Sequence, residues 1–275
     1  MTKPMWQSGK SQTMSDQSGR GVFITFEGGE GAGKTSQIRL LTQKLEEIGL
    51  SVVTTREPGG SPGGEAIRHV LLSGAAEIFG SEMEAILFSA SRSDHIDLVI
   101  EPALKAGKVV ISDRFFDSTR VYQGVSGKVD MAFIKLLEQI ACAGTIPDLT
   151  IIIDLDPKEG MARARKRRGE KVEPDRFEKD DLMEQESRRQ GFLQIAKEEP
   201  ERCVVVSGKG TEKQVHTRIW RAIKDRLGGL IVARGLGCGM ESEKKTASKS
   251  KSTAAKRPLA KQTKRGQEKV GVGNE

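Results

Sequence analysis

A glycine-rich segment contains the residues best suited to bind a phosphate. Residues 28–35 read Gly-Gly-Glu-Gly-Ala-Gly-Lys-Thr and match the pattern G-x-x-x-x-G-K-[S/T] at every required position. Glycines permit a sharp turn whose backbone N–H groups point at one anion, and a following helix adds its partial positive charge. The alternative is a strand–helix turn with an accidental lysine. The residues predicted to hold a nucleoside triphosphate are Gly28, Gly29, Glu30, Gly31, Ala32, Gly33, Lys34 and Thr35.

Within this motif, two side chains have distinct expected tasks. We expect Lys34 to reach the β- and γ-phosphates and the Thr35 hydroxyl to ligate Mg²⁺. A second magnesium ligand is predicted at Asp113, which follows the apolar run Val109-Val110-Ile111. An acidic residue directly after a buried strand would lie at the carboxyl edge of the sheet, beside the phosphate loop.

The remaining chemistry-bearing residues are mostly arginines. Arg56 ends the β-branched run Val52-Val-Thr-Thr55, and residues 163–176 hold seven Lys/Arg side chains. The three histidines, His69, His95 and His216, are far apart in sequence, and we expect each to be a surface or packed residue. Guanidinium groups bind phosphate oxygens in a planar fork. Transfer between two phosphates needs positioning and charge neutralisation and no general base, because the acceptor is already anionic.

Alternating strand and helix patterns surround these residues. Short β-branched runs predict strands at 22–26, 51–55, 108–112, 149–155 and 203–207. Helical patterns follow the phosphate motif and cover about 64–73, 81–105, 117–143 with a break near 124–127, 182–199 and 211–227. Asp156-Pro157 predicts a further helix start. The order predicts a three-layer P-loop NTPase fold of α/β class, with a five-stranded parallel sheet covered by helices on both faces.

Charge is distributed unevenly along the chain. Residues 241–275 hold ten Lys/Arg and four Asp/Glu, and residues 1–20 hold three and one. Of the net charge of +7, this leaves −1 for residues 21–240. A nucleic-acid groove in the core is therefore not expected. The rival reading from another class is a nucleic-acid-binding P-loop ATPase that uses the basic tail.

The predicted domains follow from these patterns. We expect a disordered leader at 1–20, one P-loop domain at 21–228 and a basic disordered tail at 229–275. Met14 is a hypothetical true start. No apolar run of about 18 residues exists, so no membrane span is expected. The three scattered cysteines do not suggest disulfides and fit the cytoplasm.

Several motifs together resemble the bacterial type of thymidylate kinase, a P-loop nucleoside monophosphate kinase. Beyond the phosphate motif, they are Arg56-Glu-Pro-Gly-Gly60, Phe88-Ser-Ala-Ser-Arg92, Asp113-Arg114 and Tyr122-Gln-Gly124, followed by the arginine-rich segment. They occur in the family's order, over about residues 21–228. The resemblance implies transfer of a phosphoryl group from ATP to dTMP, with Mg²⁺, and a homodimer. Another nucleoside monophosphate or deoxynucleoside kinase is the alternative.

The resemblance also implies roles for acceptor-side residues. Arg56 would face the acceptor phosphate, and Arg114 would bridge the donor and acceptor phosphates. The implied substrate-binding residues are Glu30 at the sugar 3′-hydroxyl, Tyr122 near the sugar 2′ carbon, Phe88 stacked on thymine, and Arg92 at a base oxygen, in addition to Arg56 and Arg114. A stacking ring alone does not select a base, whereas the donors of an arginine can.

The arginine-rich segment, at about 163–181, would form a mobile lid. In this family a transition-state arginine comes either from the phosphate loop or from the lid, and this loop has Gly31 and no arginine. The resemblance therefore implies the lid. Arg163, Arg165 and Arg167 are the candidates.

Overall fold

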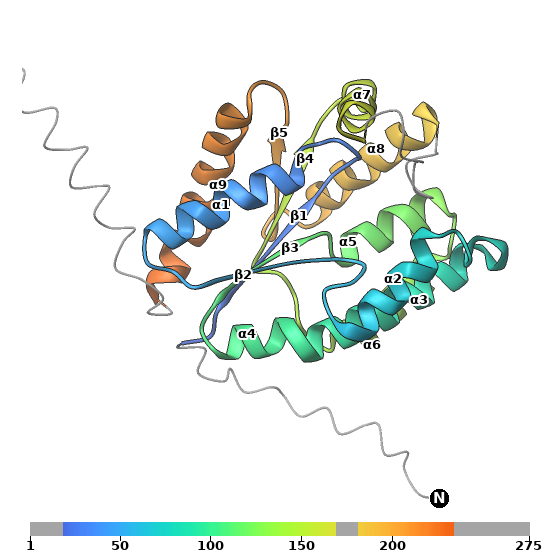
Figure 1. Ribbon diagram of the computed structural model, residues 1–275, viewed down its shortest axis with the longest axis horizontal. Coiled ribbons are helices and arrows are strands. Elements are labelled where there is room, and N and C mark those ends of the chain that lie inside the picture. The colour runs from blue at the N-terminus through green and yellow to red at the C-terminus, as the bar shows by residue number, and fades with distance from the viewer. Residues whose placement is uncertain (1–18, 169–180, 234–275) are drawn as a thin grey trace, which may run out of the picture. The chain divides into compact units, whose positions relative to one another are not determined.

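A parallel sheet of five strands forms the centre of the fold (Figure 1). The computed structural model describes residues 19–168 and 181–233, all in the first of two units into which the chain divides at Gly239. The strands are β1 (Val22–Glu27), β2 (Val52–Arg56), β3 (Val109–Asp113), β4 (Leu149–Asp154) and β5 (Cys203–Ser207). Their order is β2-β3-β1-β4-β5, and every neighbouring pair is parallel. The predicted fold class is confirmed.

Burial explains the composition of the strands. All six residues of β1 are buried, and β3 and β4 are buried except at their last residue. In the edge strands β2 and β5, buried or half-buried residues are interspersed with exposed ones. Central strands are covered on both faces, which is why β1, β3 and β4 are mostly apolar, with a few buried polar residues such as Thr25, Glu27 and Thr150.

Helices cover both faces of the sheet. On one face α1 (Lys34–Glu47) and α9 (Glu212–Ala233) pack together against the strands. On the other, α4 (Glu101–Lys105) contacts β3 and α8 (Leu182–Glu198) contacts β4 and β5. The remaining segments are α2 (Pro62–Leu72), η1 (Glu77–Phe79), α3 (Gly80–His95), η2 (Ile96–Ile100), α5 (Phe116–Thr119), η3 (Arg120–Ser126), α6 (Met131–Cys142) and α7 (Pro157–Arg168).

Most predicted segments are confirmed, and the differences have local causes. The region 81–105 is interrupted at η2, and the region 117–143 contains the π-helical η3, where the Gly127 N–H reaches the Tyr122 carbonyl. The predicted break near 124–127 lies at the end of this segment. π-Helical turns occur often at functional sites.

Two predicted boundaries differ from the structure. α7 begins where Asp156-Pro157 predicted, with the Asp156 side chain accepting the Lys158 N–H, but it continues to Arg168 and so includes the first part of the expected lid. α9 extends to Ala233, beyond the expected domain end at 228. The rest of the lid, the leader up to residue 18 and residues 234–275 lie outside the described residues.

Strand register brings separate sequence segments to one edge of the sheet. Phe26 of β1 and Arg56 of β2 both pair with Asp113 of β3. The residues that follow these strands therefore emerge side by side at the carboxyl edge, where ligands bind in open α/β sheets. Among residues 19–168 and 181–233, no helix is long and apolar enough to cross a bilayer.

Candidate active site

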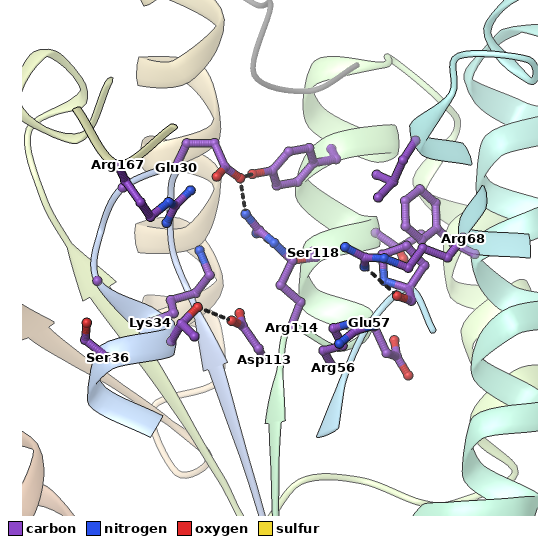
Figure 2. Close-up of a pocket in the computed structure, with 18 of the residues that line it drawn as sticks. Glu30, Lys34, Ser36, Arg56, Glu57, Arg68, Asp113, Arg114, Ser118 and Arg167 are labelled. Carbon is purple, nitrogen blue, oxygen red and sulfur yellow. Dashed lines mark hydrogen bonds and ion pairs between the residues drawn. The ribbon is translucent and has the colours of Figure 1, made fainter. Parts of the chain in front are cut away.

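A cavity of about 580 Å³ opens at the carboxyl edge of the sheet. It joins the phosphate loop to the loop after β2 and to helices α2 and α3. Figure 2 shows Lys34 and Arg167 on one side, Arg56 and Arg68 on the other, and Asp113 and Arg114 between them. The predicted site residues that line the cavity are Glu30, Gly31, Gly33, Lys34, Thr35, Arg56, Phe88, Asp113, Arg114, Tyr122 and Arg167.

The phosphate loop depends on glycine at two positions where the backbone is crowded. Gly28 has φ +133°, and a Cβ there would lie 2.5 Å from the Ile153 carbonyl oxygen. Gly31 has φ +67°, and its Cβ would lie 2.0 Å from the Gly160 carbonyl oxygen. Any larger residue would push the loop away from β4 and α7. The loop can therefore turn tightly enough to direct its N–H groups at one anion.

Lys34 is the first residue of α1, and its side chain turns back over the loop. Its Nζ donates to the carbonyl oxygens of Gly28, at 3.2 Å, and Gly29, at 3.1 Å. Burial, followed by the nearby Arg114 guanidinium, lowers the pKa of Lys34. An ammonium group held by two neutral carbonyls has donors to offer a phosphate that enters the cavity.

Thr35 and Asp113 supply oxygen ligands from two different elements. The Thr35 hydroxyl donates to Asp113 Oδ2 at 3.0 Å. Hydroxyl and carboxylate oxygens suit Mg²⁺, which keeps several waters and binds phosphate oxygens. No group of three or more His, Cys, Asp or Glu side chains that could hold a metal occurs in the described part of the chain.

Arg114 occupies the middle of the cavity. Its backbone has φ +73°, unusual for a residue with a side chain. Its Nη1 donates to the Gly28 carbonyl at 3.3 Å and to the Ser118 hydroxyl at 3.1 Å, and its Nη2 donates to the Glu30 carboxylate. The guanidinium also lies 4.9 Å from the centre of the Tyr122 ring.

Glu30 places a negative charge inside the phosphate loop, whose N–H groups are suited to bind an anion. Burial opposes its ionisation, but Arg114 and then Lys34 outweigh burial and lower the pKa of Glu30 to about 2. The Tyr122 hydroxyl also donates to this carboxylate, at 3.4 Å. Burial raises the pKa of Tyr122 to about 12. Near neutral pH the site thus contains an ionised Glu30 and a neutral Tyr122.

The far side of the cavity combines positive charge with an aromatic ring. Arg56 is half exposed and donates to Glu65 at 3.0 Å, and the Phe88 ring is half buried in the cavity wall. Arg68 also lines this side, and its Nη1 donates to the Pro58 carbonyl at 2.7 Å. Cations and a flat apolar surface at this end match an anionic ligand that carries an aromatic base.

The structure places Arg92 behind the cavity wall rather than among the lining residues. Its side chain is 1% exposed. Its Nε donates to Glu57 at 2.8 Å, and its Nη2 donates to the Thr119 hydroxyl at 3.0 Å. Glu57 and Thr119 both line the cavity. In this arrangement Arg92 holds two lining residues in place.

His95 joins the same buried group. Its Nδ1 lies 3.1 Å from Glu57 Oε1, and its Nε2 lies 2.6 Å from the Thr55 hydroxyl. The sequence predicted a surface or a packed residue here, and the structure shows a packed one. Its two polar contacts fix the loop after β2 and give it a structural role at the site.

The three lid candidates have different environments on α7. Arg163 donates to the Gly208 carbonyl and to Glu159, one turn away. Arg165 is exposed and does not line the cavity. Arg167 lines the cavity, and its charge joins those of Arg114 and Lys34 in lowering the pKa of Glu30 against the effect of burial.

Several lining residues carried no signal strong enough to predict. They are Ser36, Arg39, Glu57, Pro58, Arg68, Leu72, Ser118, Thr119 and Gln123. Glu57 and Pro58 lie within the Arg56–Gly60 motif, and Gln123 lies within the Tyr122–Gly124 motif. Arg68 and Leu72 sit in an ordinary helical pattern, where a surface arginine and a core leucine are the usual interpretations.

These features define a class of protein. The parallel sheet, the glycine loop ahead of α1, and the Thr35–Asp113 pair together make a P-loop phosphotransferase site. Arg56 and Arg68, across the same cavity, are cations of the kind that could bind a second phosphate.

Comparison with known proteins identifies the family. The sequence model described as thymidylate kinase matches residues 26–219. Curated thymidylate kinases of Afipia carboxidovorans and Rhodopseudomonas palustris are both 50% identical to this chain. The matches cover 78% and 76% of the chain, and 94% and 90% of the relatives. The crystal structure of a thymidylate kinase from Ehrlichia chaffeensis is 35% identical, with a TM-score of 0.59, and the match covers 74% of this chain and 99% of that one. The chain belongs to the thymidylate kinase family.

The charge balance at Glu30 leads to a test by titration. We predict that NMR of ¹³C-labelled glutamate will show the Glu30 carboxylate ionised from pH 8 down to pH 4. Because its pKa is lowered to about 2, its stabilising effect is present above the ordinary pKa and lost only as the pH falls towards 2. In Arg114→Ala the pKa should rise, because burial is then less opposed.

Tyr122→Phe is the matched control, since it removes a hydroxyl contact to Glu30 and leaves Arg114 in place. A Glu30 carboxylate that titrates at its ordinary pKa, or that is insensitive to Arg114→Ala, would contradict this picture of the site.

Proposed function

We propose that this chain transfers the γ-phosphoryl group of ATP to dTMP, giving ADP and dTDP, in the cavity at the carboxyl edge of the sheet. Membership of the thymidylate kinase family carries the choice of substrate. The observation that carries the site is the joining of the phosphate loop and the Arg56–Phe88 side in one cavity.

On the donor side, residues 28–35 would wrap the ATP phosphates. The loop N–H groups and the helix N-terminus bind negative charge, and Lys34 would exchange its carbonyl partners for β- and γ-phosphate oxygens. Thr35 and Asp113 would hold Mg²⁺, which when bound neutralises charge on the β- and γ-phosphates. The hydrogen bond between Thr35 and Asp113 keeps both of these metal-binding side chains beside the phosphate loop.

On the acceptor side, Arg56 would bind the phosphate of dTMP, and Phe88 would stack on thymine. Arg114 would contact both phosphates from its place beside the Gly28 carbonyl. Glu30 would accept from the sugar 3′-hydroxyl, and the bulk of Tyr122 would exclude a 2′-hydroxyl. Arg92 does not line the cavity but is bonded to Glu57 and Thr119, which do, so its contribution would be positioning or a contact at the back of the pocket.

No general base is needed for this reaction. The attacking oxygen of dTMP is already anionic, so the residues need only hold the two phosphates in line and neutralise the charge that they share. Lys34, Arg114 and Arg167 are the cations that converge on that position. Closure of the arginine-rich segment would exclude water.

An assay of ADP release against a panel of acceptors tests the substrate. We predict turnover with dTMP and much lower turnover with dCMP, dGMP, AMP and thymidine, because the pocket shape and the donors of Arg92 would select the base that stacks on Phe88, and Arg56 would require a phosphate. Phosphorylation of thymidine but not dTMP would select a nucleoside kinase. ATP hydrolysis stimulated by DNA and lost on removal of residues 241–275 would select a nucleic-acid-dependent ATPase.

Among the lid candidates, the geometry favours Arg167 as the transition-state arginine. We predict that Arg167→Ala lowers kcat about 10³-fold with little change in stability, since the side chain lines the cavity and is exposed. Arg165→Ala, the matched exposed arginine on the same helix, should keep near-normal kcat. Near-normal kcat in Arg167→Ala, measured by the same ADP-release assay, would refute the assignment.

We also infer that the protein forms a homodimer through α3, α6 and η1. Large apolar side chains are exposed there: Ile78, Phe79, Ile86, Leu136 and Ile140. α3 and α6 pack together and lie beside α2 (Figure 1). Clustered exposed apolar surface marks association sites, and a second copy of the chain is the partner that the family resemblance implies.

Sedimentation tests the dimer. Ile140→Glu, on a residue 67% exposed, should convert the dimer to a monomer without unfolding it. Met183→Glu on α8, 81% exposed, is the control and should leave the dimer intact. A monomeric wild-type protein would contradict the proposal.

The state of the cysteines is relevant to the cellular compartment of the protein. Cys142 and Cys203 are free and buried, and burial raises the pKa of each thiol to about 12. Unreactive free thiols fit a reducing compartment, and we place the enzyme in the cytoplasm.

A further inference from the structure

Glu27 is a fully buried carboxylate that the reaction described above does not use. It is the last residue of β1 and directly precedes the phosphate loop, and its side chain is completely shielded from solvent. Burial, followed by the neighbouring Asp117 carboxylate, raises the pKa of Glu27 to about 7. Burying a carboxylate is unfavourable unless it is well hydrogen-bonded, so its partners show what it holds.

Glu27 accepts three hydrogen bonds from two residues of the segment after β3. Its Oε1 accepts the backbone N–H groups of Phe115, at 2.8 Å, and Ser118, at 3.3 Å. Its Oε2 accepts the Ser118 hydroxyl at 2.7 Å. One side chain on β1 therefore binds both the short turn that leads from β3 into α5, at Phe115, and α5 itself, at Ser118.

That turn carries Arg114 in its unusual left-handed conformation. The Arg114 N–H donates to the Phe26 carbonyl at 2.9 Å, and the next N–H, of Phe115, is the one that Glu27 accepts. The left-handed backbone is disfavoured for a residue with a Cβ and persists only where its surroundings hold it. The hydrogen bonds from the N–H groups of Arg114 and Phe115 to β1 stabilise this conformation.

The side chain of Arg114 is linked to the same carboxylate. The Ser118 hydroxyl donates to Glu27 and accepts from Arg114 Nη1 at 3.1 Å. Glu27 thus fixes Arg114 twice, through the backbone at Phe115 and through the hydroxyl at Ser118. Arg114 in turn faces the cavity, whereas Glu27 lines none of it.

We propose that Glu27 is a positioning residue that holds the Arg114 guanidinium at the junction between the donor and acceptor phosphates. The inference rests on the proposed function, because it assumes that Arg114 contacts both phosphates. It predicts that loss of Glu27 lowers turnover only through Arg114.

A double-mutant cycle between Glu27→Gln and Arg114→Ala tests this link. Glu27→Gln keeps the shape and the backbone contacts at Oε1 but replaces the oxygen that Ser118 and Arg114 depend on. We expect kcat to fall about 100-fold, as for a misplaced catalytic group, with little change in the KM for ATP. In the Arg114→Ala background, Glu27→Gln should change kcat less than about twofold, because coupled residues are not additive.

Two further variants keep the test decisive. Ser118→Ala removes only the hydroxyl that links Glu27 to Arg114. It should lower kcat in the wild type but not in Arg114→Ala. This result tests the positioning of Arg114 even if Glu27→Gln does not fold. Thr25→Val is the control: it is a buried polar residue of β1, bonded to Thr150 at 2.7 Å, and should leave kcat unchanged.

The outcomes separate the two proposals. If Arg114→Ala lowers kcat but the losses of Glu27→Gln and Arg114→Ala multiply, Glu27 acts independently and only this inference fails. If Arg114→Ala keeps near-normal kcat, the role of Arg114 in the proposed function fails and the inference fails with it. Absence of dTMP phosphorylation in the wild type would overturn the proposed function directly.

Discussion

One backbone carbonyl, that of Gly28, accepts hydrogen bonds from two cations, Lys34 at 3.2 Å and Arg114 at 3.3 Å. These like charges repel, and Arg114 contributes, after burial, to the lowered pKa of Lys34. Glu30 supplies the main compensating negative charge, followed by Asp113. The site therefore holds its cations in place before a phosphate enters, and a preorganised site need not reorganise at the moment of reaction.

Sheet order makes this convergence possible. Because β3 lies between β2 and β1, Asp113 is next to both Phe26 and Arg56, although these residues come from three distant segments. The phosphate loop leaves β1 at the same edge. A donor nucleotide and a phosphorylated acceptor can thus meet across one strand, which agrees with membership of the thymidylate kinase family.

Much of this arrangement could be predicted from local sequence. The strands and the phosphate loop depend on short patterns, since apolar runs and glycines act within a few residues. Arg92 shows the limit: its helical spacing from Phe88 places both on one face, but only the fold shows that Glu57 and Thr119 bury its guanidinium. Two further features depend on contacts between distant segments and so could not be predicted from local sequence. They are the choice among the lid arginines and the link from Glu27 to Arg114.

The most direct test of the account is a crystal structure of the protein with Mg²⁺, ADP and dTMP. We predict the β-phosphate of ADP within about 3 Å of Lys34 Nζ and the loop N–H groups, and the dTMP phosphate within about 3 Å of Arg56 and Arg114. The thymine ring should lie against Phe88. A phosphate bound away from the glycine loop, or dTMP bound without contact to either arginine, would contradict the account.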